Sequence, residues 1–230
     1  MNAIITEGED DVQFLAAIAK ELNTVQENTC SFQSTAMKSL SKRKLVLDLK
    51  AKINEITRGK IRRIGLVIDQ DTHSLQERLD FLNEVVEEAY GSTNVFQTTN
   101  TLYTIPIEED TTVELACYFM NVEGTGELET VLRAIKTQPS PHADCLEAWQ
   151  GCILEKGKTL TEKQFIKLWI GNYVRLHTCF TSKFRKNVGE YCSINRLDNI
   201  LARTGDKITF DLQHPTLNPL KEFLRLFPNK

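Results

Sequence analysis

Two short acidic motifs, each directly behind an apolar segment, are the residues in this sequence best suited to chemistry. The first is EGEDD at residues 7–11, which follows NAIIT, and the second is DQD at residues 69–71, which follows IGLVI. Three carboxylates brought together repel one another strongly unless a cation lies between them. Hard oxygen ligands of this kind suit Mg²⁺ or Mn²⁺ rather than Zn²⁺. The two motifs therefore predict a divalent metal site built from Glu7, Asp69 and Asp71.

Each motif taken alone also has a simpler interpretation. Acidic residues at 7–11 would be favourable in the first turn of a helix, where the helix dipole stabilises negative charge. Residues 69–71 would also suit a turn capped by an aspartate side chain. The occurrence of both motifs, each at the end of an apolar segment with a helix between them, favours the metal site.

The segments around the motifs indicate an α/β fold with a mostly parallel sheet. The apolar segment before residue 69 is typical of a strand that is covered on both faces, and amphipathic stretches follow both motifs. Further strands are expected at residues 95–100, 101–107 and 114–122, and helices at residues 10–22, 40–59, 74–91 and 126–135. Ligands of such sheets bind outside the carboxyl ends of the strands, which is where Glu7 and Asp69 are expected.

The character of the sequence changes after residue 138, because almost every later segment predicts a helix. No low-complexity linker or internal repeat separates the two parts. We therefore expect an α/β domain at residues 1–138 and a helical C-terminal part at residues 139–230 that packs on it.

Composition narrows the class of protein. A formal net charge of −3 over 230 residues gives no overall basic field of the kind that attracts nucleic acid, so such a partner would need a local basic patch or bound metal. The sequence shows no basic, apolar leader and no run of about 18 apolar residues, which argues against export and against a membrane span. The six cysteines include no CxxC pair, which is typical of reduced thiols. We therefore expect a cytoplasmic protein without a membrane partner.

The two acidic motifs together resemble the signature of the Toprim family, which topoisomerases, bacterial primases and the overcoming-lysogenization-defect nucleases share. The shared pattern is strand–Glu7-Gly8-x-x-Asp11 and strand–Asp69-x-Asp71. Residues 119–132, together with 182–204 and 217–227, are similar to a small stand-alone Toprim-like family of uncharacterised bacterial and archaeal proteins. The resemblance spans nearly the whole chain and implies a Toprim-like mostly parallel sheet flanked by helices, with a helical C-terminal part.

The resemblance implies a role for each acidic residue. Glu7 would be a metal ligand that also acts as general acid or base, and Asp69 and Asp71 would be the paired metal ligands. Asp11 would help to hold a second metal or orient the first. Gln70 departs from the small residue common at the middle position of the second motif, but its side chain is expected to point away from the ligands.

Residues further along the chain would complete such a site. Glu129 matches a downstream glutamate of the family, and its neighbour Glu127 is the alternative candidate for the same role. Lys183 matches a lysine that would stabilise charge on a phosphate. The basic residues Lys183, Arg185 and Lys186, with Lys163, Lys167 and Arg175, are the best candidates for phosphate contact, although a solvated helix face explains them equally well. A second basic set lies at residues 42–44 and 58–63.

Together these features predict a Mg²⁺- or Mn²⁺-dependent nuclease that hydrolyses phosphodiester bonds of DNA or RNA. The chain has no GxxxxGK[ST] motif, so an ATPase, if it takes part, would be a separate partner, as a role in phage defence would allow. The alternative is a non-catalytic Toprim-like metal-binding module that regulates or docks to a partner protein. Nucleotidyl transfer, as in primases, is a third hypothesis, for which the sequence shows no nucleoside triphosphate motif.

Overall fold

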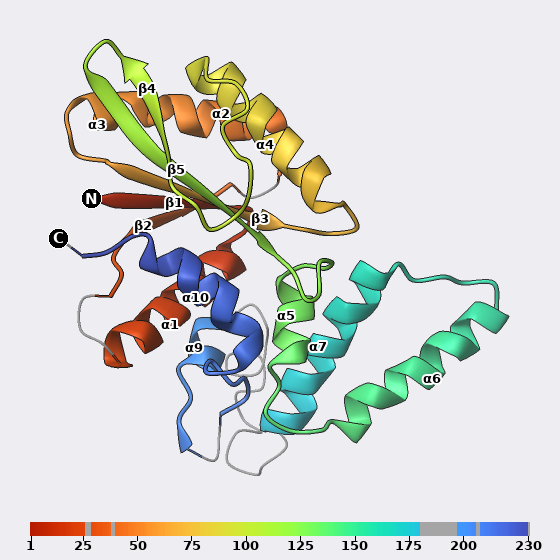
Figure 1. Ribbon diagram of the computed structural model, residues 1–230. Coiled ribbons are helices and arrows are strands. Elements are labelled where there is room, and N and C mark those ends of the chain that lie inside the picture. Colours follow the sequence, from red (N-terminus) through yellow and green to blue (C-terminus); the bar gives the residue numbers. More distant parts are fainter. Residues whose placement is uncertain (26–28, 38–39, 180–196, 206–207, 230) are drawn as a thin grey trace. The chain divides into compact units, whose positions relative to one another are not determined.

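The computed structural model describes residues 1–25, 29–37, 40–179, 197–205 and 208–229. It confirms the expected α/β class, with a five-stranded, mostly parallel sheet flanked by helices and a helical C-terminal part (Figure 1). The chain forms two compact units, one of residues 1–128 with 215–230 and one of residues 129–214. Within the part of the chain that the structure describes, no helix is long and apolar enough to cross a membrane.

The sheet brings three carboxyl strand ends to one edge. Its order is β2-β1-β3-β5-β4, and only β4 runs antiparallel to its neighbour. In the register, Thr6 pairs with Val67 and Asp69 pairs with Met120, so β1, β3 and β5 end side by side. The strands are β1 (Asn2–Thr6), β2 (Gln33–Ala36), β3 (Arg63–Asp69), β4 (Tyr103–Glu108) and β5 (Thr111–Met120).

Helices cover both faces of this sheet (Figure 1). One face packs against α2 (Lys42–Ala51), α3 (Ile53–Thr57) and α4 (Leu75–Tyr90), and the other packs against α1 (Glu9–Val25) and α10 (Asn218–Arg225). A short 3₁₀ turn, η4 (Pro215–Leu217), leads into α10. Apolar residues of β3 alternate between the two helical layers, as a strand covered on both faces requires.

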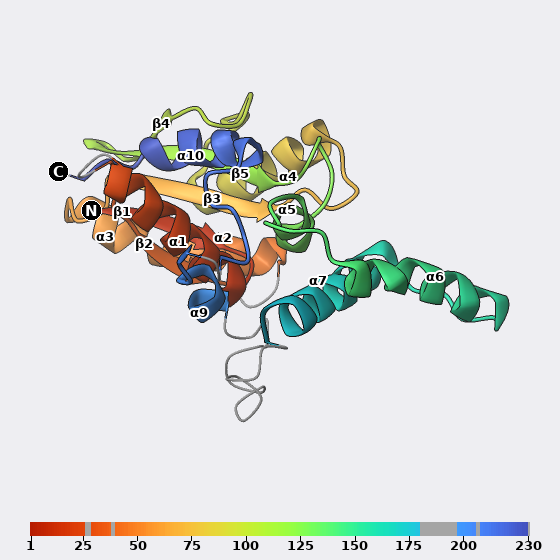
Figure 2. The ribbon, with the colours of Figure 1, turned by 90° about the horizontal axis from the view of Figure 1, so that it is seen from below.

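The C-terminal residues belong to the sheet unit rather than to the helical unit. A Cβ atom added at Gly65, in the middle of β3, would lie 2.8 Å from Phe227 Cζ and 2.9 Å from Phe223 Cζ, so only glycine allows this close packing. The two termini lie side by side in both views (Figures 1 and 2), and Asn2 Nδ2 donates to the Pro228 carbonyl at 3.0 Å. We expected one boundary at residue 138, whereas the chain passes from one unit to the other after residue 128 and again after residue 214.

Two expected elements differ from the structure. The strand predicted at residues 95–100 is wrong, because this segment is a loop whose Gln97 and Thr98 amides donate to the Tyr103 hydroxyl instead of to a strand. The helix predicted at 40–59 ends at Ala51, and a second, short helix follows Lys52.

Helices dominate the second unit. Within it, α6 (Pro141–Glu155) packs against α7 (Glu162–Cys179), and the buried Trp169 ring of α7 stacks on Tyr173 at a centroid distance of 5.3 Å. Backbone hydrogen bonds join residues 135 and 137, which follow α5 (Leu128–Ala134), to residues 211 and 209 of the same unit, with Asp211 N donating to the Ile135 carbonyl at 2.7 Å. The described helices of this part are α5 (Leu128–Ala134), whose first residue still belongs to the sheet unit, α6 (Pro141–Glu155), α7 (Glu162–Cys179) and α9 (Leu197–Leu201).

Candidate metal centre

Three carboxylates gather at the edge where β3 and β5 end. One carboxylate oxygen each of Asp69, Asp71 and Glu127 lies within 4.8 Å of the other two. Asp69 and Asp71 are partly exposed, whereas Glu127 is only 3% exposed. The second acidic motif therefore does bring its two aspartates together, and the third member of the group comes from the segment after β5.

Backbone hydrogen bonds explain how Glu127 reaches the aspartates. Asp71 N donates to the Gly126 carbonyl at 2.7 Å, and Gly126 N donates back to the Asp71 carbonyl at 2.9 Å. Gln70 N also donates to the Met120 carbonyl at 2.9 Å. These bonds extend the pairing of β3 with β5 beyond the strands, so the residue after Gly126 is fixed beside Asp71.

Glu7 contacts the same edge from the neighbouring strand. Its Oε1 accepts a hydrogen bond of 2.9 Å from the backbone N–H of Asp69. The side chain therefore reaches from the end of β1 to the end of β3, as the adjacent strand ends predict. Among the described residues, the group within 4.8 Å comprises only the two aspartates and Glu127, so Glu7 lies next to this group rather than within it.

Asp11 stabilises the turn between β1 and α1. Its Oδ2 accepts a hydrogen bond of 2.8 Å from Gly8 N, and the residue is 7% exposed. This contact joins both ends of the EGEDD motif. The role of Asp11 at a second metal stays a prediction.

Arg78 is the residue of this site that the sequence interpretation missed. Its Nη2 lies 2.6 Å from Asp71 Oδ2, and its Nε donates to the Gln70 carbonyl at 3.3 Å. The residue is 6% exposed on α4 and continues the apolar stripe of Leu82 and Val85 along that helix. A charged residue in register with an apolar stripe signals a buried charge, which is rarely found without a partner.

Glu129 is not a member of the cluster formed by Asp69, Asp71 and Glu127. Glu129 belongs to the second unit, where its Oε1 is 3.3 Å from Lys167 Nζ. Lys183, Arg185 and Lys186 lie outside the described residues. The metal-binding role of Glu129 and the phosphate-binding role of Lys183 stay predictions.

Arg63, of the second basic set, is far from the carboxylates. Arg63 begins β3 and Asp69 ends it, so a rise of about 3.3 Å per residue separates them by about 20 Å. Arg63 and Lys42 also have carboxylate partners, with Arg63 Nε 2.6 Å from Glu114 and Lys42 Nζ 3.0 Å from Glu84. These two cations therefore stabilise the fold rather than approach a ligand at the site.

Comparison with known proteins places the chain in a family. Residues 1–228 match the model of a family described as "Protein of unknown function (DUF3226)". The chain belongs to this family. No curated protein and no solved structure gives a match.

The three clustered carboxylates of this DUF3226 chain, of Asp69, Asp71 and Glu127, fit a hard divalent cation. All three ligand candidates are oxygen donors, and an octahedral Mg²⁺ with ligands at about 2.1 Å holds opposite oxygens about 4.2 Å apart. The three oxygens, which all lie within 4.8 Å of one another, are close to this separation. A charged Glu127, buried beside two aspartates, would need cations to compensate it, and Arg78 supplies one such charge.

Proposed function

We propose that this chain is a Mg²⁺- or Mn²⁺-dependent nuclease that hydrolyses phosphodiester bonds of DNA or RNA. The observation that carries the proposal is the group of three carboxylate oxygens, from Asp69, Asp71 and Glu127, within 4.8 Å of one another. This group lies at the carboxyl edge of a mostly parallel sheet, where such folds bind ligands. The resemblance of both acidic motifs to the Toprim signature supports the same function.

The residues divide the work as follows. Asp69, Asp71 and Glu127 would hold the cation, which when bound would supply a water of lowered pKa and offset negative charge on a phosphate. Glu7, oriented by the Asp69 N–H, would act as general acid or base at the attacking water or the leaving oxygen. Because the carboxylates alone repel phosphate, the chain binds nucleic acid only together with divalent metal.

A cytoplasmic role in phage defence or nucleic-acid processing, with a separately encoded ATPase as partner, agrees with the Toprim resemblance and with the lack of a phosphate-binding GxxxxGK[ST] loop in the sequence.

Cleavage assays with matched variants test the nuclease proposal. The purified chain should cleave single-stranded or duplex DNA or RNA with Mg²⁺ or Mn²⁺, and EDTA should abolish the activity. Asp69→Asn and Glu7→Gln should each lower the rate by at least about a hundredfold, as loss of a metal ligand or an acid–base group does. Asp80→Asn, on the exposed surface of α4, is the control and should retain activity. Equal cleavage by the parent and the Asp69→Asn chain would contradict the proposal.

One contact favours a second candidate, a non-catalytic metal-binding module that regulates or docks to a partner. Arg78 already neutralises Asp71, at 2.6 Å, so one carboxylate of the site is less available to hold a catalytic cation. Under this alternative, Asp69→Asn lowers the stability of the metal-loaded protein, and neither the parent nor any variant cleaves nucleic acid. Unfolding in urea with and without Mg²⁺, beside the cleavage assay, separates the two functions.

A further inference from the structure

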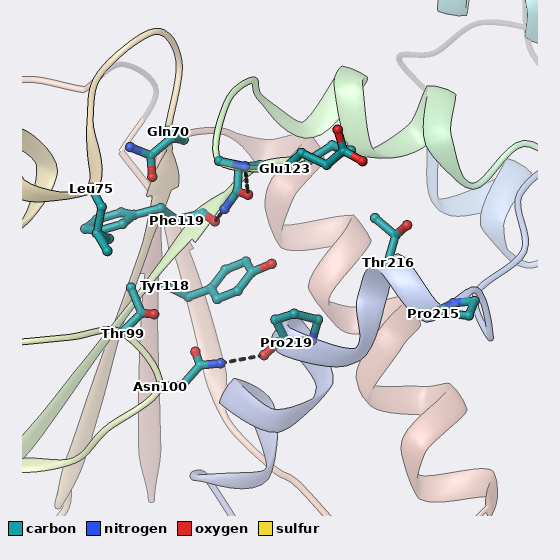
Figure 3. A pocket seen from close by; sticks show the side chains of 13 residues that line it. Gln70, Leu75, Thr99, Asn100, Tyr118, Phe119, Glu123, Pro215, Thr216 and Pro219 are labelled. Carbon is teal, nitrogen blue, oxygen red and sulfur yellow. Dashed lines mark hydrogen bonds between the residues drawn. The ribbon is translucent and has the colours of Figure 1, made fainter.

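A cavity lies beside the cluster of Asp69, Asp71 and Glu127, at the same edge of the sheet. Its volume of about 460 Å³ falls within the roughly 300–1,000 Å³ of small-molecule sites. Gln70, which separates the two aspartates of the group, lines this cavity, and so do residues 118–119 at the end of β5. Figure 3 shows Tyr118 in the middle of the lining side chains, with Gln70 on one side and Asn100 and Pro219 on the other.

The lining is polar but carries no positive charge. The described residues around the cavity include three amides, of Gln70, Asn100 and Asn121, and one carboxylate, of Glu123, but no lysine, arginine or histidine. A phosphate in this cavity would lack a counter-charge and would face Glu123. The lining therefore suits a neutral group with hydrogen-bonding edges.

The two helices that begin at the cavity do not turn it into an anion site. The first turn of α4 is closed by a capping box, in which Glu77 N donates to Ser74 Oγ at 3.2 Å. The first turn of α10 contains Pro219, which has no N–H to donate. Both helix ends thus offer few donors to a phosphate, despite their dipoles.

Tyr118 supplies an aromatic ring and a hydroxyl group. One side of its ring contacts Phe223, at a centroid distance of 5.7 Å, and the side chain lines the cavity. Burial raises the pKa of Tyr118 to about 12, so the hydroxyl stays protonated and remains a donor at neutral pH. No described residue forms a hydrogen bond with this hydroxyl, which leaves it available to a ligand.

Asn100 adds an acceptor. It adopts a left-handed backbone conformation, φ 56°, and its Nδ2 donates to the Pro219 carbonyl at 2.9 Å. Its Oδ1 is shielded from water and has no hydrogen-bond partner among the described residues. A buried acceptor in this state is unfavourable, so a ligand donor that reaches it after a small side-chain shift would be stabilised.

We propose that this cavity binds one unpaired nucleobase of the substrate strand while the adjoining phosphate lies at the carboxylate group. Planar, neutral bases with donor and acceptor edges match a lining of amides, hydroxyls and an aromatic ring. A base within a duplex cannot enter, because its edges are paired and its faces are stacked. The inference rests on the proposed nuclease function and narrows its substrate to single-stranded or locally unpaired nucleic acid.

Nucleoside binding tests the cavity without metal or phosphate. We would titrate adenosine, guanosine, cytidine and uridine in EDTA and detect binding by saturation-transfer NMR. Leu75 lines the cavity and is 50% exposed at the start of α4, so Leu75→Trp should fill the cavity without unfolding the chain. We expect at least a tenfold loss of nucleoside affinity in Leu75→Trp and less than a twofold change in the control, Leu75→Ala. Tyr118→Phe, which keeps the ring, should weaken binding by about three- to tenfold through loss of one hydrogen bond.

Competition with oligonucleotides then tests whether the bound base comes from single-stranded nucleic acid. With Ca²⁺ present, a single-stranded oligonucleotide should displace the nucleoside, and the same sequence as a blunt duplex should not. The inference is overturned if no nucleoside binds the parent, if Leu75→Trp binds as well as Leu75→Ala, or if the single strand fails to compete. Because the nucleoside titration uses neither metal nor catalysis, an inactive chain that still binds nucleosides would refute the nuclease and leave the cavity assigned.

Discussion

The ion pair between Arg78 and Asp71 predicts how metal and protein stability are coupled. Arg78 Nη2 lies 2.6 Å from Asp71 Oδ2, with the side chains 8% and 31% exposed. Loss of one partner from a buried pair costs about 3–5 kcal/mol, whereas exposed pairs contribute about 0–1 kcal/mol. Because Asp71 is about one third exposed, we expect Asp71→Asn to destabilise the metal-free chain by about 1–3 kcal/mol. Asparagine also tolerates the left-handed backbone of Asp71, φ 51°, so the loss reports on charge.

Arg78→Met should have a different consequence, because it removes the cation that competes with metal. A monovalent and a divalent cation about 5 Å apart repel by about 2 kcal/mol even at the dielectric constant of water. We therefore expect Arg78→Met to bind Mn²⁺ at least about tenfold more tightly than the parent. Its free energy of unfolding should fall in EDTA and recover more than that of the parent when metal is added.

Urea unfolding, followed by circular dichroism in EDTA and in saturating Mn²⁺, measures both effects. The four chains of a double-mutant cycle are the parent, Asp71→Asn, Arg78→Met and the double variant, and Asp80→Asn on the exposed side of α4 is the charge control. An equal metal-dependent gain in the parent and in Arg78→Met would show that Arg78 and the cation do not share the carboxylates, and would refute the reasoning.

Three further predictions concern the elements that position the site. Gly65→Ala should destabilise the chain by about 1–3 kcal/mol in urea unfolding, because the new Cβ would lie 2.8 Å from Phe227 Cζ, whereas Gly151→Ala, with no atom within 4 Å, should not. Hydrogen bonds from the Ser74 N–H and hydroxyl lower the pKa of Glu77 in the folded chain. The stability that they contribute is complete above about pH 4.5, the ordinary pKa of Glu77, and is lost as the pH falls through the lower pKa of the folded state. Urea unfolding between pH 5 and pH 3 should therefore show a smaller loss of stability in Ser74→Ala than in the parent. Burial raises the pKa of Cys117 to about 12 and also raises the pKa of Cys30. Mass spectrometry after brief alkylation of the native chain should therefore find the exposed Cys145 and Cys152 modified, whereas Cys30 and Cys117 should be modified only in urea. Early modification of Cys117 would contradict its burial.

The sequence predicts the frame of the site well, because strand and helix periodicity is a local property. The apolar run at residues 64–68 indicates β3, and Asp69 does lie at its carboxyl end. The expectation that Glu7 lies beside Asp69 rests on adjacent parallel strands, and the 2.9 Å hydrogen bond between them agrees with it.

The parts that depend on long-range contacts were not predictable in the same way. Glu127 and Glu129 are two residues apart, and the backbone bridge between Asp71 and Gly126, which are 55 residues apart in the sequence, decides which of them joins the aspartates. Strand β2, with its alternately exposed residues 33–36, has no apolar run to reveal it and pairs only at the sheet edge. The return of α10 to the sheet depends on the missing side chain of Gly65, whose partners are 158 and 162 residues away.

Binding of a divalent cation by the carboxylates of Asp69, Asp71 and Glu127 is central to this account. Calorimetric titration of Mn²⁺ into the parent, Asp69→Asn and Asp80→Asn tests it most directly, with circular dichroism to confirm that all three chains are folded. We predict that the parent and Asp80→Asn bind Mn²⁺ with similar affinity and that Asp69→Asn loses at least tenfold. Binding of equal strength by Asp69→Asn, or no binding by the folded parent with or without a single-stranded oligonucleotide, would contradict the claim.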